Sequence, residues 1–297
     1  MPGAGPGLAG GTSGLTPRAD EGRRIDACGG RGTDGMTDLH SFVVPAYGRS
    51  PYLAACLASL AAQQAPSPIV VATSTPFDGI EDLCRAHRAR LVVHAPNRGI
   101  GNDWNRALDA ADTPLVTIAH QDDTYHRGYS AAMLDAYRAR PGAALYFCDA
   151  EEITEDGDAR ADGMNARVKR MLVAAAFIGR RSVHGPVARR LLLGLGNSIV
   201  CPAVTLNRGL APDFRFREDL RTNMDWLAWL DLSERGAIAR VPGRLMAHRV
   251  HTRSETARCL DDGSRRAEDA LVFNRLWPAP VASILGRLYS RSYQEYI

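Results

Sequence analysis

The sequence predicts an α/β fold with a mostly parallel central sheet and helices on both faces. Between residues 41 and 148, short apolar runs alternate with segments whose apolar residues recur at helical spacing. The runs are rich in Val, Ile and Leu and are nearly free of charge, as expected of strands buried on both faces. Such alternation is typical of βαβ units joined by right-handed crossovers.

The expected elements follow in chain order. Ser50 and Pro51 predict the N-cap and first turn of the first helix, and Asp78 is expected to cap the second. The second half is less regular. Strands are predicted at 41–45, 69–72, 91–94, 115–119, 143–148 and near 237–241, and helices at 50–63, 78–84, 104–111, 129–137, 225–235 and 264–276.

Composition narrows the class of protein. The chain has 297 residues, of which 45% are hydrophobic and 23% charged, as in a globular protein with a substantial core. Its net charge of +3 is too mild to indicate nucleic-acid binding. The six cysteines form no C-x-x-C pair, so we expect reduced thiols and a cytoplasmic protein. No apolar run reaches the roughly 20 residues that span a bilayer.

The N-terminal segment differs from the rest. Residues 1–36 are dominated by Gly, Ala, Pro, Thr, Asp and Arg without periodicity, so we expect a disordered leader. Met36 directly precedes the first periodic segment and is an alternative natural start. Residues 37–297 are expected to form one domain with two halves, about 40–150 and about 151–297.

Two adjacent acids follow the fourth predicted strand, in the run His120-Gln121-Asp122-Asp123. Ligands of parallel α/β sheets bind beyond the carboxyl ends of the strands. Carboxylates at such a position suit Mg²⁺ or Mn²⁺ that also binds a diphosphate. The alternative is a helix N-cap, in which either acid accepts free N–H groups of the next helix.

Five motifs in order resemble the family-two inverting glycosyltransferases, which use the A-type glycosyltransferase fold. The resemblance runs from about Ser41 to His251, and the implied fold is a single nucleotide-diphospho-sugar-transferase-like domain. The motifs are the strand and loop 41–49 with the helix through Gln63, the turn Asn97-Arg98-Gly99, the metal motif 120–123, the acidic helix start Asn223-Met224-Asp225-Trp226 and the late histidine motif His248-Arg249-Val250-His251.

The resemblance implies roles for individual residues. Asp225 is expected to be the base that deprotonates the acceptor hydroxyl; otherwise it is an ordinary first-turn acid favoured by the helix dipole. Mg²⁺ or Mn²⁺ is expected on Asp123, Asp122 and His251, although a surface histidine is the alternative for the last. The donor, a UDP- or dTDP-linked sugar, is expected to contact Pro45, Ala46, Tyr47, Arg49, Thr73, Asn97, Gly99, Gln121 and Asp122.

Two positions depart from the family pattern. Thr73-Ser74 stands where the family usually has an acid that holds the base or ribose of the nucleotide, so the sequence does not specify the nucleobase. Trp104 stands where many relatives carry arginine, which removes an expected phosphate contact.

The segment 167–195 interleaves basic and apolar residues. Its basic residues are Arg167, Lys169, Arg170, Arg180, Arg181, Arg189 and Arg190, and its apolar residues include Leu172, Val173, Phe177, Leu191, Leu192 and Leu193. A basic amphipathic surface can rest on an anionic membrane. We therefore expect peripheral contact with the inner face of the membrane and a glycan or lipid-linked acceptor in cell-envelope synthesis; the alternative is a solvated helix face.

Two other functions are compatible with this fold. A nucleotidyltransferase is one, and the glycine-rich run Gly29-Gly30-Arg31-Gly32-Thr33 is reminiscent of its phosphate loop, but this run precedes the first strand instead of following it. The other is a catalytically silent carbohydrate-binding or scaffold protein, suggested by the missing acid at Thr73.

Overall fold

The computed structural model describes residues 39–251, 255, 259 and 263–295, which belong to one compact unit, Asp34–Ile297. The predicted leader, the alternative start at Met36 and the glycine-rich run 29–33 lie outside the described residues.

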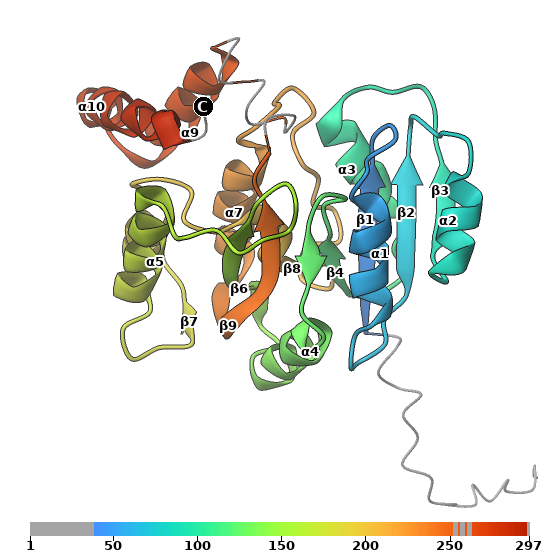
Figure 1. Cartoon of the computed structure of the whole chain (residues 1–297). Coiled ribbons are helices and arrows are strands. Elements are labelled where there is room, and N and C mark those ends of the chain that lie inside the picture. Colours follow the sequence, from blue (N-terminus) through green and yellow to red (C-terminus); the bar gives the residue numbers. More distant parts are fainter. Residues whose placement is uncertain (1–38, 252–254, 256–258, 260–262, 296–297) are drawn as a thin grey trace, which may run out of the picture. The chain divides into compact units, whose positions relative to one another are not determined.

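Within the described part of the chain, nine strands form one sheet in the order β3-β2-β1-β4-β8-β6-β9-β5, with β7 paired to β9 (Figure 1). The longest pairings, β6 with β9 and β1 with β2, are parallel, while β8 pairs antiparallel with both β4 and β6. The predicted fold class is confirmed. The strands are β1 (His40–Ala46), β2 (Ile69–Thr73), β3 (Arg90–Val93), β4 (Leu115–Ile118), β5 (Thr124–Tyr125), β6 (Ala143–Ile153), β7 (Ser182–Val183), β8 (Val204–Asn207) and β9 (Ala237–Arg249).

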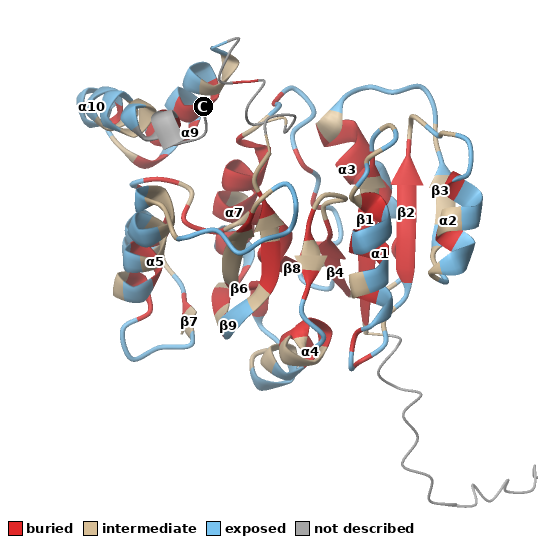
Figure 2. Ribbon diagram, in the orientation of Figure 1, coloured by how far each residue is buried: buried red, intermediate tan, exposed pale blue. Residues whose placement is uncertain are grey.

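Helices cover both faces of the sheet. The period-two alternation of β1 sends Phe42 and Val44 into one core, with α1, α2 and α4, and Val43 into the other, with α3, α5, α6, α7, α9 and α10. Strands β1, β2, β4 and β8 are therefore buried on both faces, whereas β3 is partly exposed, and the outer sides of the helices are exposed (Figure 2). The helices are α1 (Leu53–Ala61), α2 (Ile80–Ala86), α3 (Ile100–Asp109), α4 (Tyr129–Ala139), α5 (Met164–Ala176), α6 (Pro186–Leu193), α7 (Met224–Arg235), α9 (Ser264–Leu276) and α10 (Ala279–Tyr289).

Two expected helix caps are wrong. The residue before α2 is Gly79, at a positive φ of 91°, and no side chain, including that of Asp78, caps this helix. Helix α1 begins at Leu53, later than expected, because Ser50 has another role: its hydroxyl donates to Asp122 Oδ1 at 2.9 Å. Ser50 thus connects the first loop to the acidic motif.

Helix α3 connects the two halves of the chain. A Cβ on Gly101 in α3 would lie 2.5 Å from the carbonyl oxygen of Arg217, so only glycine permits this close approach. Beside it, Asn105 Nδ2 donates to the carbonyl of Phe216 at 2.9 Å and to Glu218 at 3.0 Å. The segment that leads to α7 is therefore fixed against the start of α3.

The order of the strands places a crevice above β1. Strand β2 lies on one side of β1 and β4 on the other, so the connections leave in opposite directions. In open α/β sheets such a reversal leaves a crevice at the carboxyl ends of the strands, where ligands bind. In the described residues, no helix is both long and apolar enough to cross a membrane.

Candidate active site

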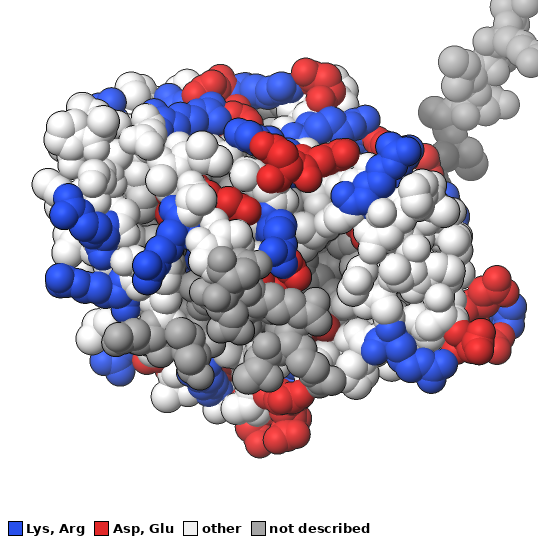
Figure 3. All heavy atoms as spheres, turned by 90° about the horizontal axis from the view of Figure 1, so that it is seen from above, with Lys and Arg blue, Asp and Glu red and all other residues white. Residues whose placement is uncertain are grey.

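A pocket of about 860 Å³ lies at the carboxyl ends of these strands. Figure 3 looks onto this face, where basic and acidic side chains gather close together. Of the residues expected at the site, Ala46 and Thr73 do not line the pocket, because both are buried in the sheet with 1% exposure. The pocket is lined by the others, namely Pro45, Tyr47, Arg49, Asn97, Gly99, Gln121, Asp122, Asp123, Asp225 and His251.

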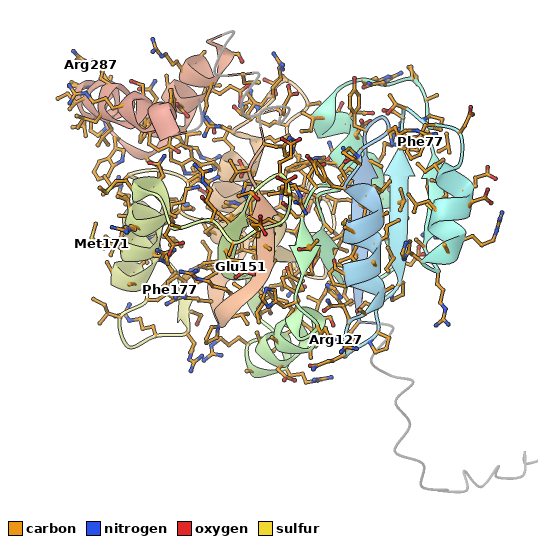
Figure 4. All side chains as sticks on the ribbon, in the orientation of Figure 1. Phe77, Arg127, Glu151, Met171, Phe177 and Arg287 are labelled. Carbon is orange, nitrogen blue, oxygen red and sulfur yellow. The ribbon has the colours of Figure 1, made fainter. Side chains whose placement is uncertain are left out.

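The loop after β1 is held by side-chain to backbone hydrogen bonds. The backbone N–H of Tyr47 donates to Gln121 Oε1 at 3.1 Å, and Gln121 Nε2 donates back to the Tyr47 carbonyl at 3.3 Å. The Arg49 guanidinium lies 5.1 Å from the ring centre of Phe77, which is labelled in Figure 4. Tyr47 itself is 56% exposed at the pocket mouth. Gln121 therefore fixes the loop as well as lining the pocket.

The turn before α3 has the geometry that its sequence predicts. The side-chain oxygen of Asn97 accepts the backbone N–H of Gly99 at 2.8 Å, and Gly99 has a positive φ of 98°. Trp104 packs against His120, with 5.1 Å between ring centres, and against Phe216. This position therefore contributes an apolar wall in place of a cation.

Asp122 is the partly accessible acid of the motif. Its Oδ1 accepts the Ser50 hydroxyl, and its Oδ2 lies 3.4 Å from His251 Nε2. Burial raises the pKa of Asp122, but the hydrogen bonds from His251 and Ser50 outweigh burial and hold it below the ordinary value. Asp122 is therefore an ionised carboxylate facing an imidazole.

Asp123 is the deeply buried acid of the motif, with 2% exposure. Burial raises its pKa well above the ordinary value, although its Oδ1 accepts the backbone N–H of Arg249 at 2.8 Å. The alternative role of these acids as helix caps is wrong: β5 follows them directly, and α4 begins later, at Tyr129, without a side-chain cap. The two neighbouring acids thus differ sharply in environment.

Arg249 is a site residue that the sequence reasoning missed. Its Nε donates to the Asp122 carbonyl at 3.0 Å, and its Nη1 donates to the carbonyls of Thr154 and Glu155 at 3.0 and 2.8 Å. Its guanidinium also lies 4.6 Å from the ring centre of Tyr52. Its position between the two histidines of the late motif is the sequence feature that could have identified it. It fixes the acidic loop to the ends of β6 and β9.

The side chains that could ligate a metal ion in this pocket fit a divalent ion that is shared with a diphosphate. Among the described residues, no three His, Cys, Asp or Glu side chains converge closely enough to hold an ion alone. Mg²⁺, however, usually binds through one or two carboxylates together with substrate phosphates and water. The Asp122–His251 pair could supply two ligands, and among the described residues the buried Oδ2 of Asp123 and Nδ1 of His251 have no hydrogen-bond partner. The pair suits an ion that is completed by substrate.

Asp225 lines the same pocket from the first turn of α7. Its Oδ2 accepts from Asn197 Nδ2 at 2.8 Å, and its Oδ1 accepts the backbone N–H of Trp226 at 2.6 Å. Burial raises the pKa of Asp225 from 3.8 to about 6, although Trp226, Arg265 and Asn197 each lower it. The side chain is a first-turn acid, as the alternative interpretation had it, and it also lies in the pocket. A carboxyl group whose pKa is raised in this way suits proton transfer near neutral pH.

The raised pKa of Asp225 predicts a pH dependence. If Asp225 is the base, kcat/KM should rise with pH through about 6 and then level off, because only the carboxylate accepts a proton. Folding stability should change in the opposite direction. The contribution of Asp225 is fully present below pH 3.8 and is lost as pH rises through about 6, since the unfolded chain ionises more readily. Rate profiles and unfolding curves between pH 4 and 8 measure both; a flat rate profile contradicts the assignment.

Two acids of α9 fix the loop that precedes Asp225. Glu268 accepts the backbone N–H groups of Arg221, Thr222 and Asn223 at 2.8–2.9 Å. The next residue, Asp269, accepts from Asn223 Nδ2 at 2.6 Å. Glu268 is buried, and burial raises its pKa, but these hydrogen bonds hold it below the ordinary value. The C-terminal helices therefore position the start of α7.

Glu268→Ala should destabilise the protein by about 2–4 kcal/mol, because buried N–H donors that lose their acceptor each cost about 1–3 kcal/mol. Urea unfolding followed by tryptophan fluorescence measures the change. Glu234→Ala is the matched control: its side chain is 53% exposed in an ion pair with Arg189, and it should cost less than about 1 kcal/mol. Equal losses in the two variants would show that the loop is not held by Glu268.

Comparison with known proteins identifies the family. Residues 41–208 match the model of glycosyl transferase family 2, and the chain belongs to this family. It is therefore a glycosyltransferase. A curated protein of Mycobacterium tuberculosis (strain CDC 1551 / Oshkosh), MT1568, is 25% identical over 236 residues, which cover 75% of this chain and 70% of the relative.

Solved structures of glycosyltransferases share the fold. The mannosyltransferase PcManGT from Pyrobaculum calidifontis, in complex with GDP-Man and Mn²⁺, has a TM-score of 0.59 and 17% identity, covering 86% of this chain and 69% of that one. S. aureus TarS 1–349 in complex with UDP has a TM-score of 0.54 and 18% identity, covering 86% of this chain and 72% of that one. At these identities the likeness establishes the fold.

Proposed function

We propose that this glycosyltransferase transfers a sugar from a nucleotide-sugar donor to an acceptor hydroxyl, with inversion at the anomeric carbon and with Mg²⁺ or Mn²⁺ as cofactor. The observation that carries the proposal is that the Asp122–His251 pair and the buried Asp225 line one pocket at the point where the strand order reverses. Residues 37–297 act as one domain in this proposal, with donor groups from the first half and the base from the second.

Asp122 and His251 would hold the divalent ion, and Asp123 would support them. When bound, the ion offsets negative charge on the departing nucleoside diphosphate. The chain itself orients the ligands: Ser50 fixes one oxygen of Asp122, and Arg249 fixes the backbone of the acidic loop. Asp122 is proposed as the direct ligand in preference to Asp123, because the Asp122 side chain is 28% exposed to the pocket whereas Asp123 is 2% exposed.

Asp225 would accept the proton of the acceptor hydroxyl as that oxygen attacks the anomeric carbon. Asn197 holds one carboxylate oxygen, which fixes the orientation of the other. A single displacement by an activated hydroxyl inverts the anomeric configuration, and no side chain has to form a covalent intermediate.

The donor is expected to carry UDP or dTDP. Two of the structural neighbours are complexes with UDP and UDP-GlcNAc, and a third holds GDP-Man. Thermal shifts of the protein against a panel of UDP-, dTDP- and GDP-sugars, each with and without Mn²⁺, test the proposal, since a ligand that binds only the folded state raises its stability. A metal-dependent shift with one nucleotide supports it. The absence of any shift across the panel at millimolar concentrations contradicts it.

We further propose that the acceptor is a glycan or lipid-linked molecule of cell-envelope synthesis and that the segment 167–195 contacts the inner face of the membrane. The apolar residues expected to do so require correction: Leu172, Val173, Phe177, Leu192 and Leu193 are buried in the core. Leu191 is exposed, as expected, and Met171, at 64% exposure, points away from α5 (Figure 4). The exposed apolar residues of this surface are Val168, Met171, Ile178, Val187, Leu191 and Leu195.

Membrane contact predicts co-sedimentation with anionic vesicles. Protein should pellet with phosphatidylcholine vesicles that contain phosphatidylglycerol and not with phosphatidylcholine alone, since each Lys or Arg near an anionic surface contributes about 1 kcal/mol. Ile178→Glu combined with Val187→Glu should reduce the pelleted fraction several-fold, because both side chains are more than three-quarters exposed, at 76% and 80%. Val93→Glu on β3 is the control. Pelleting that does not depend on the anionic lipid counts against the contact.

A further inference from the structure

The first turn of α3 contributes a buried acid to the pocket wall, and the proposed mechanism does not use it. Asp103 lines the pocket but is only 6% exposed. Its Oδ2 accepts the Ser74 hydroxyl at 3.0 Å. Its Oδ1 is buried and has no hydrogen-bond partner among the described residues. His94 Nε2, which also has no partner there, is 3.8 Å from this oxygen, beyond hydrogen-bond distance.

The position of Asp103 is unfavourable for a carboxylate without a ligand. Burial raises the pKa of Asp103, although the Ser74 hydroxyl and His94 oppose the rise. Buried polar groups in folded proteins nearly always have hydrogen-bond partners, and leaving one unpaired costs free energy. A ligand in the pocket that brings an N–H or O–H group to this carboxylate would supply a hydrogen bond that the protein lacks.

The end of β2 cannot supply this hydrogen bond through Thr73. That side chain is 1% exposed, and its hydroxyl oxygen accepts the backbone N–H of Thr75 at 3.1 Å. The Thr75 hydroxyl in turn accepts the backbone N–H of Gly48 at 2.7 Å, which holds the loops after β1 and β2 together. Asp103 reaches the same end of the pocket from α3, where Ser74 fixes one of its oxygens.

The order of the strands separates Asp103 from the proposed metal ligands. Strands β2, β1 and β4 lie side by side in that order (Figure 1). Ser74 directly follows β2, whereas Asp122 lies in the loop after β4. Neighbouring strands are about 4.8 Å apart, so these two strand ends are separated by about 10 Å. Asp225 lies on the other side, because α7 packs against β6, which is beyond β4 and β8 in the sheet.

We propose that Asp103 accepts a hydrogen bond from the nucleoside part of the donor, either from the ring N–H of its base or from a ribose hydroxyl. The inference rests on the proposed function, because a diphosphate beside Asp122 and a sugar facing Asp225 direct the nucleoside toward Asp103. Base and ribose present the same chemistry to a carboxylate, a polarised N–H or O–H group. The two sources are distinguished by nucleotides that lack one or the other.

Calorimetry with three nucleotides, each in the presence of Mn²⁺, tests the proposal. UDP is compared with 3-methyluridine diphosphate, which lacks the ring N–H, and with 2′,3′-dideoxyuridine diphosphate, which lacks both ribose hydroxyls. The wild type should bind one of these analogues about tenfold more weakly than UDP, since a hydrogen bond to a charged acceptor is roughly twice as strong as a neutral one. Asp103→Asn should bind UDP about tenfold more weakly and should no longer discriminate against that analogue.

Two controls separate recognition of the nucleoside from damage to the fold. Asp109 ends the same helix, pairs with Arg215 at 2.8 Å and does not line the pocket, so Asp109→Asn should bind all three nucleotides as the wild type does. Inorganic pyrophosphate has no nucleoside. With Mn²⁺, it should bind Asp103→Asn as tightly as it binds the wild type.

The contradicting outcomes are distinct. A UDP affinity of Asp103→Asn within twofold of the wild type overturns the proposal. So does a variant that still discriminates against the analogue as the wild type does, or that loses pyrophosphate affinity to the same extent as UDP affinity, since the acid then acts elsewhere. A wild type that binds UDP and both analogues equally overturns this inference alone. A wild type that binds neither UDP nor pyrophosphate with Mn²⁺ refutes the proposed donor site itself.

Discussion

Asp225→Asn is expected to lower kcat by about 10²–10⁴-fold, the range that general acid–base catalysis contributes. The amide has the same shape and can still accept the N–H of Trp226 through its oxygen, but it cannot take the proton of the acceptor hydroxyl. Initial rates at saturating donor and acceptor measure the loss. Binding of UDP with Mn²⁺, measured by calorimetry, should be unchanged, because the proposed nucleotide contacts come from the opposite half of the pocket.

A second acid on the same helix provides the control for Asp225. Asp231 pairs with Arg275 at 2.5 Å and does not line the pocket, so Asp231→Asn should retain nearly full activity. A kcat for Asp225→Asn within threefold of the wild type would assign the base to another residue. The acid limb of the pH–rate profile near 6 should also be absent in Asp225→Asn, which separates the loss of a titrating group from local distortion.

Asp122→Asn is expected to weaken Mn²⁺-dependent UDP binding by at least tenfold. The ionised carboxylate becomes neutral, whereas both of its contacts, to Ser50 and His251, can persist with an amide. Titration of UDP into the protein with Mn²⁺, and again with EDTA, isolates the metal-dependent part of the affinity. In the variant the two titrations should become nearly equal.

Asp123→Asn distinguishes the two acids. Its carbonyl oxygen can still accept the N–H of Arg249, and burial has already raised the pKa of the native carboxyl group. This variant should therefore retain more of the metal-dependent affinity than Asp122→Asn. The opposite order of losses would make Asp123 the direct ligand.

Sequence periodicity was sufficient for the parallel half of the sheet. Strands β1, β2, β3 and β4 are apolar runs between turn residues, and each was predicted within one or two residues. The short antiparallel strands β5, β7 and β8 were not predicted. Strands β5 and β7 have only two residues each, too few for any periodicity, and β8 lies in the less regular second half of the chain. The extension of β9 to Arg249 was also missed, since its later residues pair with the polar end of β6.

The position of the candidate site could be predicted from the sequence, but the long-range hydrogen bonds that hold it could not. Asp122 was located because it follows a predicted strand, and Asp225 because it begins a predicted helix. Both also lie in motifs that occur in the family's order along the chain. Arg249 and Glu268 act across more than 40 positions of sequence, and no local pattern marks such partners. Thr73 and Ala46 were assigned by motif position, whereas the pleat directs these paired residues to the buried face of the sheet that α1, α2 and α4 cover. The glycine run that suggested a nucleotidyltransferase lies outside the described residues, and membership of glycosyl transferase family 2 argues against that alternative.

The most direct test is the anomalous scattering of Mn²⁺ in crystals of the protein grown with Mn²⁺ and a non-transferable nucleotide-sugar analogue. We predict one strong peak between Asp122 and His251, bridged to the diphosphate, with the anomeric carbon of the sugar facing Asp225 across the pocket. A peak elsewhere, or a sugar directed away from Asp225, would contradict the proposed mechanism.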